Sequence, residues 1–150
     1  MAKLPDNLKL TEINIPGSVV TVGDYAFANT GIVEIRLPVS VVTVGAGAFE
    51  GCSSLNKVIV LENSALETIK SSAFKGCAKL NLIVIPGTIQ NIAPDAIDPS
   101  VKIYWYGTQA QFESSAVKAS LSGAQVFYYS ASNDPQHWYY KDNGTNVAIW

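Results

Sequence analysis

A 22-residue repeat constrains the fold of this chain more than any other feature of its sequence. The segment TEINIPGSVVTVGDYAF is followed by VEIRLPVSVVTVGAGAF, in which most of the apolar residues return. Ile13 corresponds to Ile35 (35 − 13 = 22) and Phe27 corresponds to Phe49 (49 − 27 = 22). A fixed period of this length is typical of a solenoid, whose units bury their apolar side only against one another.

Each repeat begins with apolar residues in the pattern L-x-x-L-x-L, which predicts a short strand with its apolar side chains on one face. The pattern occurs four times, beginning at Leu10, Ile32, Leu55 and Leu80, so the copies are 22, 23 and 25 residues apart. The extra residues of the third copy fall within 61–68, where an insertion lengthens a loop and leaves the core register unchanged. The sequence therefore predicts a repeat solenoid over residues 1–100, with repeats near 10–31, 32–54, 55–79 and 80–100 and with 1–9 as a partial repeat or open end.

The second half of each repeat carries alanine followed by a large apolar residue, as in Ala26-Phe27 and Ala48-Phe49. Such a segment is too short for a free-standing helix. It predicts one or two turns that press the aromatic ring onto the neighbouring strand.

The last third of the chain departs from the repeat and predicts a capping module over residues 101–150. VKIYWYG, which starts at Val101, is typical of a fifth strand. Thr108 with Gln111 three residues later matches a capping box, which predicts a helix that continues to about Leu121. Phe112 and Ala116 then fall on one face of that helix, and we expect this face to lie buried over the last repeat.

Further strands are predicted near the C-terminus, at 126–130, His137–Tyr140 and Thr145–Trp150, the last two joined by the turn residues Asp142, Asn143 and Gly144. A small antiparallel hairpin is therefore expected to close the solenoid. The module is rich in aromatic residues, and large aromatic side chains dominate small cores. We interpret these rings as the core of the cap in preference to a ligand-binding box.

The charge pattern argues against two classes of partner. Ten basic and twelve acidic residues are scattered along 150 residues, which gives a net charge of −2. The sequence therefore offers no basic stripe for phosphates and no polybasic segment for anionic lipid. No apolar run approaches the roughly 20 residues that span a bilayer, and the Met1-Ala2-Lys3 start lacks the apolar core of a secretory signal. We expect neither nucleic-acid binding nor membrane insertion.

Side chains that carry catalysis are scarce. His137 is the one histidine of the sequence, and neither a nucleophile elbow nor a glycine-rich phosphate loop occurs. Cys52 and Cys77 with one histidine cannot supply the four ligands of a closed zinc site. Because the cysteines occupy equivalent positions in successive repeats (77 − 52 = 25), their side chains should run parallel, which opposes a disulfide. We expect two buried thiols, no cofactor, no metal and no enzymatic activity.

These segments resemble the BspA-like branch of the leucine-rich repeats, a family known from bacterial surface and secreted proteins. The resemblance is carried by LTEINIPGSVVTVGDYAF, GAGAFEGCSSLNKVIV and SSAFKGCAKLNLIVIPGTIQNIAPDAI, and after the repeats by IYWYGTQAQF. It implies a leucine-rich repeat solenoid with one short strand per repeat and about four to five repeats, closed by a C-terminal helix and β-hairpin cap. It also implies an extracellular or cell-surface location and a role in adhesion or interaction.

The outward side of the predicted strands is where a repeat protein normally makes its contacts. Its residues change along the stack from charged to apolar, although the inward positions are already supplied with apolar side chains. Because contiguous exposed apolar surface commonly marks an interaction site, we hypothesise that a ligand binds at Ile59, Leu82, Val84, Tyr104 and Tyr106, within a charged rim of Glu12, Glu34, Arg36, Lys57 and Lys102. The alternative is that the terminal helix or hairpin folds back and covers this face.

Glu12 and Glu34 occupy equivalent positions in adjacent predicted strands, which formally supplies the paired carboxylates of a glycosidase. Arg36 and Lys57 should lie close enough to neutralise them, so we interpret the group as a solvated charge ladder.

Two classes of function remain. The first is a non-enzymatic recognition module that binds a protein, or a glycan, through the exposed strand face in the manner of an adhesin. The second is a purely architectural segment of a longer leucine-rich repeat surface protein, whose open N-terminal face continues into further repeats. The same open face would also allow end-to-end self-association.

Overall fold

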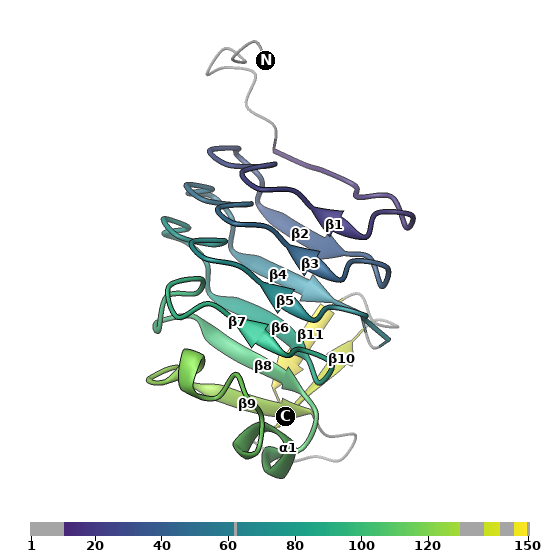
Figure 1. The fold of residues 1–150 in the computed structure, drawn as a ribbon, viewed down its shortest axis with the longest axis vertical. Helices are drawn as coiled ribbons and strands as arrows, with labels where there is room; N and C mark the ends of the chain where they lie inside the picture. Colours follow the sequence, from purple (N-terminus) through teal and green to yellow (C-terminus); the bar gives the residue numbers. More distant parts are fainter. Residues whose placement is uncertain (1–10, 62, 130–136, 142–145, 150) are drawn as a thin grey trace.

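The computed structural model describes residues 11–61 and 63–129, together with the backbone of 137–141 and 146–149. Within these residues the chain winds as a parallel solenoid of about five turns, with the terminal module at the end opposite the first repeat (Figure 1). Two sheets run along the stack. The predicted repeat solenoid is therefore confirmed.

The longer strands of the repeats form one sheet, here named the long-strand sheet. In the described residues its order is β11-β10-β9-β8-β6-β4-β2. The pairing from β2 to β10 is parallel, and β10 pairs with β11 in antiparallel fashion. The bounds are β2 (Glu34–Leu37), β4 (Lys57–Val60), β6 (Leu82–Pro86), β8 (Lys102–Tyr106), β9 (Val126–Tyr129), β10 (His137–Lys141) and β11 (Asn146–Ile149).

Strands β2, β4 and β6 lie inside the segments predicted from Ile32, Leu55 and Leu80. The strand predicted from Leu10 is not formed over residues 11–16, and Leu10 itself lies outside the described residues. From the next repeat, the Val33 N–H donates to the Thr11 carbonyl at 3.3 Å, whereas the Val19 N–H donates to the Pro16 carbonyl at 3.1 Å within the turn that follows. The segment lies at the edge of the stack, where no described strand flanks it on its other side.

A second sheet, the short-strand sheet, consists of two-residue strands that the sequence pattern did not predict. They are β1 (Thr21–Val22), β3 (Thr43–Val44), β5 (Thr68–Ile69) and β7 (Asn91–Ile92), all parallel and in this order. Val22, Val44, Ile69 and Ile92 are the inward residues of these strands and are all buried. In the described residues the repeats from Ile32 onward each contribute one strand to each sheet, the first repeat contributes β1 alone, and the core lies between the two sheets.

The phenylalanines at the ends of the turn segments form an aromatic stack along the core. The ring centroids of Phe27 and Phe49 are 5.4 Å apart, and those of Phe49 and Phe74 are 5.3 Å apart. Ile97 is buried at the fourth equivalent position. Because equivalent residues meet across successive repeats, the predicted repeat register is confirmed.

The two cysteines are free, as predicted. The Cys52 thiol donates to the Phe27 carbonyl at 3.0 Å, and the Cys77 thiol donates to the Phe49 carbonyl at 3.2 Å. Each thiol therefore ties its repeat to the preceding one. Cys52 is buried but Cys77 is only half-buried, so the burial expected for both is correct for Cys52 alone. Burial, reinforced by the neighbouring Cys52, raises the pKa of Cys77 to about 12.

The terminal module differs in part from its prediction. The capping box of Thr108 and Gln111 is confirmed, but the helix it starts, α1 (Gln109–Glu113), ends well before Leu121. A 3₁₀ helix, η2 (Ala119–Leu121), follows after a break. Phe112 is buried as expected, and Val117 and Leu121 are buried as well. Ala116 is exposed, so its predicted burial is wrong.

The hairpin predicted at the C-terminus is confirmed as the antiparallel pair β10 and β11. Its turn at 142–144 lies outside the described residues. The first strand of the expected cap, β8, pairs in parallel with β6 and so continues the long-strand sheet without interruption. A domain boundary at residue 100 therefore stays a prediction. All helices in the described residues are too short to cross a membrane.

Candidate functional site: strand face and turn groove

The outer face of the long-strand sheet is the surface on which we predicted a ligand-binding site from the sequence. The structure buries most of its apolar part, because Ile59, Val84 and Tyr104 are only 1%, 0% and 5% exposed. Leu82 and Tyr106 are half-buried. The predicted exposure of this apolar face is therefore wrong for the first three residues and overstated for the other two.

The cover comes from the end of the chain. Beyond β8 the long-strand sheet turns through β9 into β10 and β11, and Figure 1 shows these last two strands crossing behind β4, β6 and β8. The Phe127 ring of β9 packs edge-on against Tyr104 at 5.2 Å, and Tyr129 lies against Tyr106 at 4.5 Å. Because β9 pairs with β8 in the same sheet, these rings cover the face from its side, and the hairpin backbone lies behind it in Figure 1. This arrangement agrees with the alternative in which the terminal module covers the strand face.

The charged rim remains at the surface. Arg36 and Lys57 contact the same carboxylate of Glu34, at 2.9 Å and 3.6 Å, as the predicted charge ladder requires. Glu12 is exposed, and Lys102 at the start of β8 is half-buried. Since the rim no longer surrounds an open apolar surface, it does not by itself define a site.

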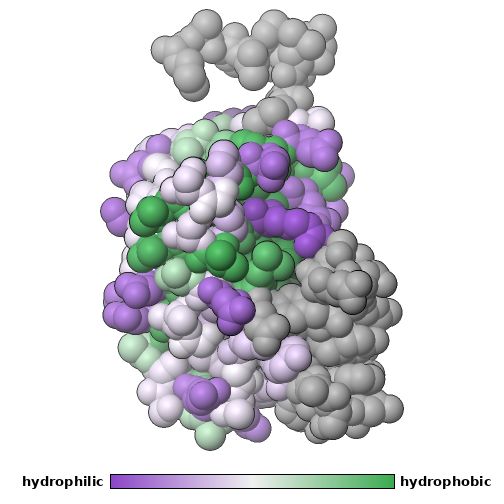
Figure 2. All heavy atoms as spheres, turned by 90° about the vertical axis from the view of Figure 1, so that its right-hand side faces the viewer, coloured by the Kyte–Doolittle hydropathy of each residue, from purple (hydrophilic) through white to green (hydrophobic). Residues whose placement is uncertain are grey.

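The turns that follow the long strands form a second surface, here named the turn face. It comprises residues 16–20, 38–42, 61, 63–67 and 86–90, and Figure 2 looks onto it. Hydrophobic side chains gather over its upper and middle part in that view. Val20, Val39 and Leu61 are 55%, 43% and 40% exposed. Of the large apolar side chains that the described residues leave exposed, these three lie on the turn face, whereas Tyr25 and Val33 lie outside it.

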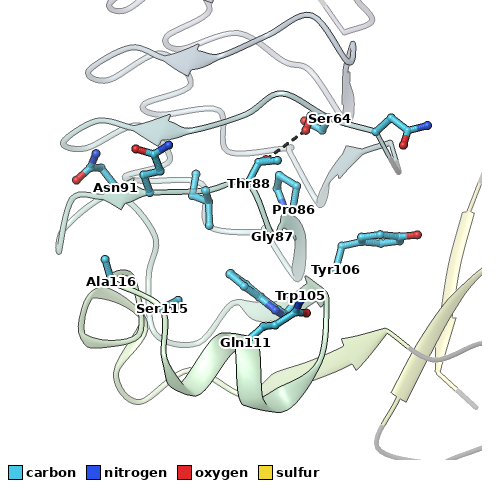
Figure 3. Close-up of a pocket in the computed structure, with 13 residues that line it drawn as sticks. Ser64, Pro86, Gly87, Thr88, Asn91, Trp105, Tyr106, Gln111, Ser115 and Ala116 are labelled. Carbon is cyan, nitrogen blue, oxygen red and sulfur yellow. Dashed lines mark hydrogen bonds between the residues drawn. The ribbon is translucent and has the colours of Figure 1, made fainter.

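At its C-terminal end the turn face leads into a groove of about 930 Å³, here named the turn groove (Figure 3). One wall is the turn after β6 with β7, and the other wall is α1 with the segment that follows it. The floor is apolar, with Pro86, Ile89 and Trp105. None of the described residues that line the groove is charged, and its polar side chains include Asn63, Thr88, Gln90, Asn91, Gln111 and Ser115.

The groove walls are held by local hydrogen bonds. The Thr88 hydroxyl donates to the Leu66 carbonyl at 2.8 Å and to the Ser64 carbonyl at 3.2 Å, which ties the turn after β6 to the preceding loop. On the other wall the Gln111 carboxamide oxygen accepts from the Thr108 N–H at 2.8 Å within the capping box. Each wall is therefore held by hydrogen bonds of its own.

The early end of α1 explains why Ala116 lies in the groove. The Ser114 hydroxyl donates to the Ala110 carbonyl at 3.0 Å, and the Ser115 hydroxyl donates to the Phe112 carbonyl at 2.7 Å. Serine hydroxyls that bond back to the backbone compete with the regular helix. In a continuous helix Ala116 would share the buried face of Phe112, whereas after the break it lines the groove instead.

The turn groove could not be found from the sequence, because it lies between β7 and α1, which a whole further strand, β8, separates along the chain. The one available signal was the Ser114-Ser115 pair inside the predicted helix. Groups that could carry catalysis are not brought together: in the described residues no cluster of three or more His, Cys, Asp or Glu side chains could hold a metal ion. The side chain of His137 lies outside the described residues.

The fold, the stacked phenylalanines and the repeated strand pattern define a leucine-rich repeat solenoid. The family model for the BspA type leucine rich repeat region matches residues 6–104 in six copies, and the chain belongs to this family. Leucine-rich repeat proteins generally serve as recognition or scaffold modules and not as enzymes. No curated protein matches the chain.

Three solved structures resemble this one. The crystal structure of the pneumococcal vaccine antigen PcpA is 23% identical, with a TM-score of 0.64 over 84% of this chain and 32% of that one. A leucine rich cell surface protein from Faecalibacterium prausnitzii is 25% identical, with a TM-score of 0.42 over 66% and 33% of the two chains. A leucine-rich repeat protein from Bacteroides ovatus is 17% identical, with a TM-score of 0.31 over 81% and 48%. The chain therefore spans about a third of the length of the first two proteins.

Proposed function

We propose that this chain is a non-enzymatic recognition segment of a bacterial surface protein and that it binds a protein partner along the turn face. The observation that carries the proposal is the open apolar surface of Val20, Val39 and Leu61 beside the turn groove. The predicted strand face is no longer available for this role, because the terminal hairpin covers its apolar part. The family and the likeness to a vaccine antigen support a place outside the cell.

The chemistry of the turn face favours a protein over a glycan. Apolar side chains that are more than a third exposed lose unfavourable hydration when a partner buries them, which supplies affinity without any charge pairing. A glycan would need an open aromatic ring on which a sugar can stack. Of the two aromatic rings that line the groove, Trp105 is only 1% exposed and Tyr106 is half-buried, and the exposed ring of Tyr25 lies outside the turn face. The following experiment distinguishes a protein partner from a glycan.

The test is a binding screen of the purified chain against immobilised extracellular-matrix proteins and glycans. The variants are Val39→Ser and Leu61→Ser on the turn face, with Val33→Ser as the matched control. Val33 is also exposed, at 45%, but it precedes β2 and lies outside the turn face. Because all three side chains are exposed, the melting temperature should hardly change.

We expect saturable binding to a protein, weakened about tenfold by each turn-face variant through lost apolar burial and unchanged by Val33→Ser. Equal affinities for all three variants would remove the turn face from the interaction. Binding to glycans alone would show that the partner class is wrong.

A second function, that of an architectural segment, is favoured by the exposure of the first repeat. Ala26 is exposed and Phe27 is half-buried. The equivalent Ala48 and Phe49, which have a repeat on both sides, are buried. The N-terminal face thus presents core positions that a further repeat would cover. Inserting a second copy of residues 32–54 directly before residue 10 should raise the melting temperature. No increase in a correctly folded insertion variant would contradict this role.

A further inference from the structure

The two sheets of the solenoid end at different levels. In the described residues the long-strand sheet continues past β6 through β8 and β9, but the short-strand sheet stops at β7. After β8 the chain enters α1, where an earlier repeat would have supplied the next short strand. The turn groove lies between β7 and α1, so it occupies the place of that strand (Figure 1, Figure 3).

A ladder of equivalent carbonyl groups runs along this side of the stack. The Val20 carbonyl accepts from the N–H groups of Val42 and Thr43, at 2.8 Å and 3.3 Å. The Val42 carbonyl accepts in the same way from Glu67 and Thr68, at 2.9 Å and 3.2 Å, and the Glu67 carbonyl accepts from Gln90 and Asn91, at 2.8 Å and 3.0 Å. The pattern occurs three times because the accepting residues, Val20, Val42 and Glu67, occupy the same position in successive repeats.

Gln90 is the fourth member of this series, and its carbonyl accepts no hydrogen bond from the described residues. It belongs to the wall of the turn groove, on the side that faces away from β5. An edge strand with an unpaired acceptor is a template for a further strand. The neighbouring walls add uncharged amide and hydroxyl groups, which suit the backbone of a peptide more than a charged ligand.

We propose that the turn groove binds an extended peptide segment of the protein partner, which adds to β7 as the next strand of the short-strand sheet. Two successive N–H groups of the peptide donate to the Gln90 carbonyl, as Gln90 and Asn91 do to Glu67. This is β-strand addition, in which main-chain hydrogen bonds give affinity and the groove selects side chains. The lining then favours small or uncharged side chains facing Ile89 and Ala116. The inference rests on the proposed function, since the peptide belongs to the same protein partner that binds the turn face.

A second copy of this chain is a weaker occupant than a peptide. Its β1 edge carries the matching N–H groups of Val20 and Thr21. To bring that edge to β7, however, its whole first repeat would have to stack on an end that β8, β9 and α1 already close. A single strand meets no such obstacle. Self-association is therefore an outcome to be measured and not part of the proposal.

The probe is a synthetic peptide with the sequence of residues 86–94, PGTIQNIAP, because this segment already pairs in the same way with β5. Its matched control is the same peptide N-methylated at the amides of Gln90 and Asn91, which removes both donors. The protein variants are Ala116→Trp, which fills the groove, and Ala110→Trp, an equally exposed alanine of α1 that does not line it. Affinities are measured by titration calorimetry, with melting temperatures as a check on folding.

We expect saturable binding of the peptide, weakened about tenfold or more by N-methylation because two hydrogen bonds are lost. Ala116→Trp should abolish binding, and Ala110→Trp should leave it unchanged. No saturable binding of the unmodified peptide, or equal affinity of the N-methylated peptide, would overturn the proposal. The proposal would also be overturned if Ala116→Trp bound the peptide as tightly as the wild type does. It would likewise be overturned if the wild-type chain formed a dimer that Ala116→Trp disrupts, because the groove would then hold a second copy of the chain.

The same variants distinguish the two proposals. If Val39→Ser and Leu61→Ser weaken the partner found in the screen but no peptide binds, the strand addition is wrong and the proposed function stands. If the peptide binds while the turn-face variants leave the partner unaffected, the groove is a peptide site and the proposed function is wrong.

Discussion

The two ends of this stack depart in opposite ways from the exposure that the repeat pattern predicts. At the N-terminal end, Ala26 and Phe27 occupy core positions of the repeat and yet remain wholly or partly exposed. At the C-terminal end, Val84 and Tyr104 occupy outward positions of the strand face and yet are buried. The side of the strand on which a residue lies therefore does not decide its exposure at either end.

The difference follows from what covers each end. A repeat buries its own core residues only against its neighbours, and within the described residues the first repeat has a neighbour on one side only. The last strands have an additional cover, because β10 and β11 turn back across the outer face (Figure 1). The four substitutions below test this difference, beginning with the largest expected effect.

The largest effect is expected for Phe49→Ala in the middle of the aromatic stack. The ring of Phe49 contacts both Phe27 and Phe74, and the residue is completely buried. Its truncation should lower the free energy of unfolding by about 3 to 5 kcal/mol, the usual cost of a large cavity. Phe27→Ala should cost clearly less, because its ring has one stacked neighbour and is partly exposed. Denaturant titrations that give equal losses would contradict the open N-terminal face.

Val84→Ala should have the next largest effect, although Val84 points outward. Loss of two buried methyl groups is expected to cost about 2 kcal/mol, including the cavity. The control is Val33→Ala, where the side chain is exposed and the cost should be near zero. A melting temperature that is unchanged by Val84→Ala would mean that the hairpin does not cover the strand face in solution.

Gly51→Ala should have a smaller effect, confined to the backbone of one turn. Gly51 has a φ of 73°, and an added Cβ would lie 2.2 Å from Oδ1 of Asn29 in the preceding repeat. Left-handed backbone costs a residue with a Cβ about 1 to 2 kcal/mol. Gly17→Ala is the control at the N-terminal end, since it meets no atom within 4 Å. Equal stability of the two variants would show that the turn adapts freely.

Much of the fold could be predicted from the sequence, because the repeat places the same residue types at the same positions. Phe27, Phe49 and Phe74 mark the register directly, and strands β2, β4 and β6 begin two residues after their apolar pattern does. The short-strand sheet was missed, since two residues per strand are too few to show a period of two. The early end of α1 was missed because serine hydroxyls replaced the expected helical hydrogen bonds.

The covered strand face had a signal that the sequence analysis interpreted differently. Strand β6, Leu82–Pro86, is apolar at every position, and a strand buried on both faces has such an uninterrupted apolar run. With the sequence alone, the outward half of this run favours a binding surface equally well. The turn groove had no comparable signal, because it depends on how β7 and α1 meet across segments far apart in the sequence.

The smallest effect is expected for Arg36→Ala at the uncovered end of the strand face. Arg36 contacts the Glu34 carboxylate at 2.9 Å, but both side chains are substantially exposed, at 40% and 32%. Exposed ion pairs contribute little because water screens them and because two long side chains lose freedom. The free energy of unfolding should therefore change by no more than about 0.5 kcal/mol. Denaturant titrations at low and high salt measure it, and any loss seen at low salt should shrink at high salt. A loss as large as that of Val84→Ala, and insensitive to salt, would mean that the cover reaches the N-terminal end and that the two ends do not differ.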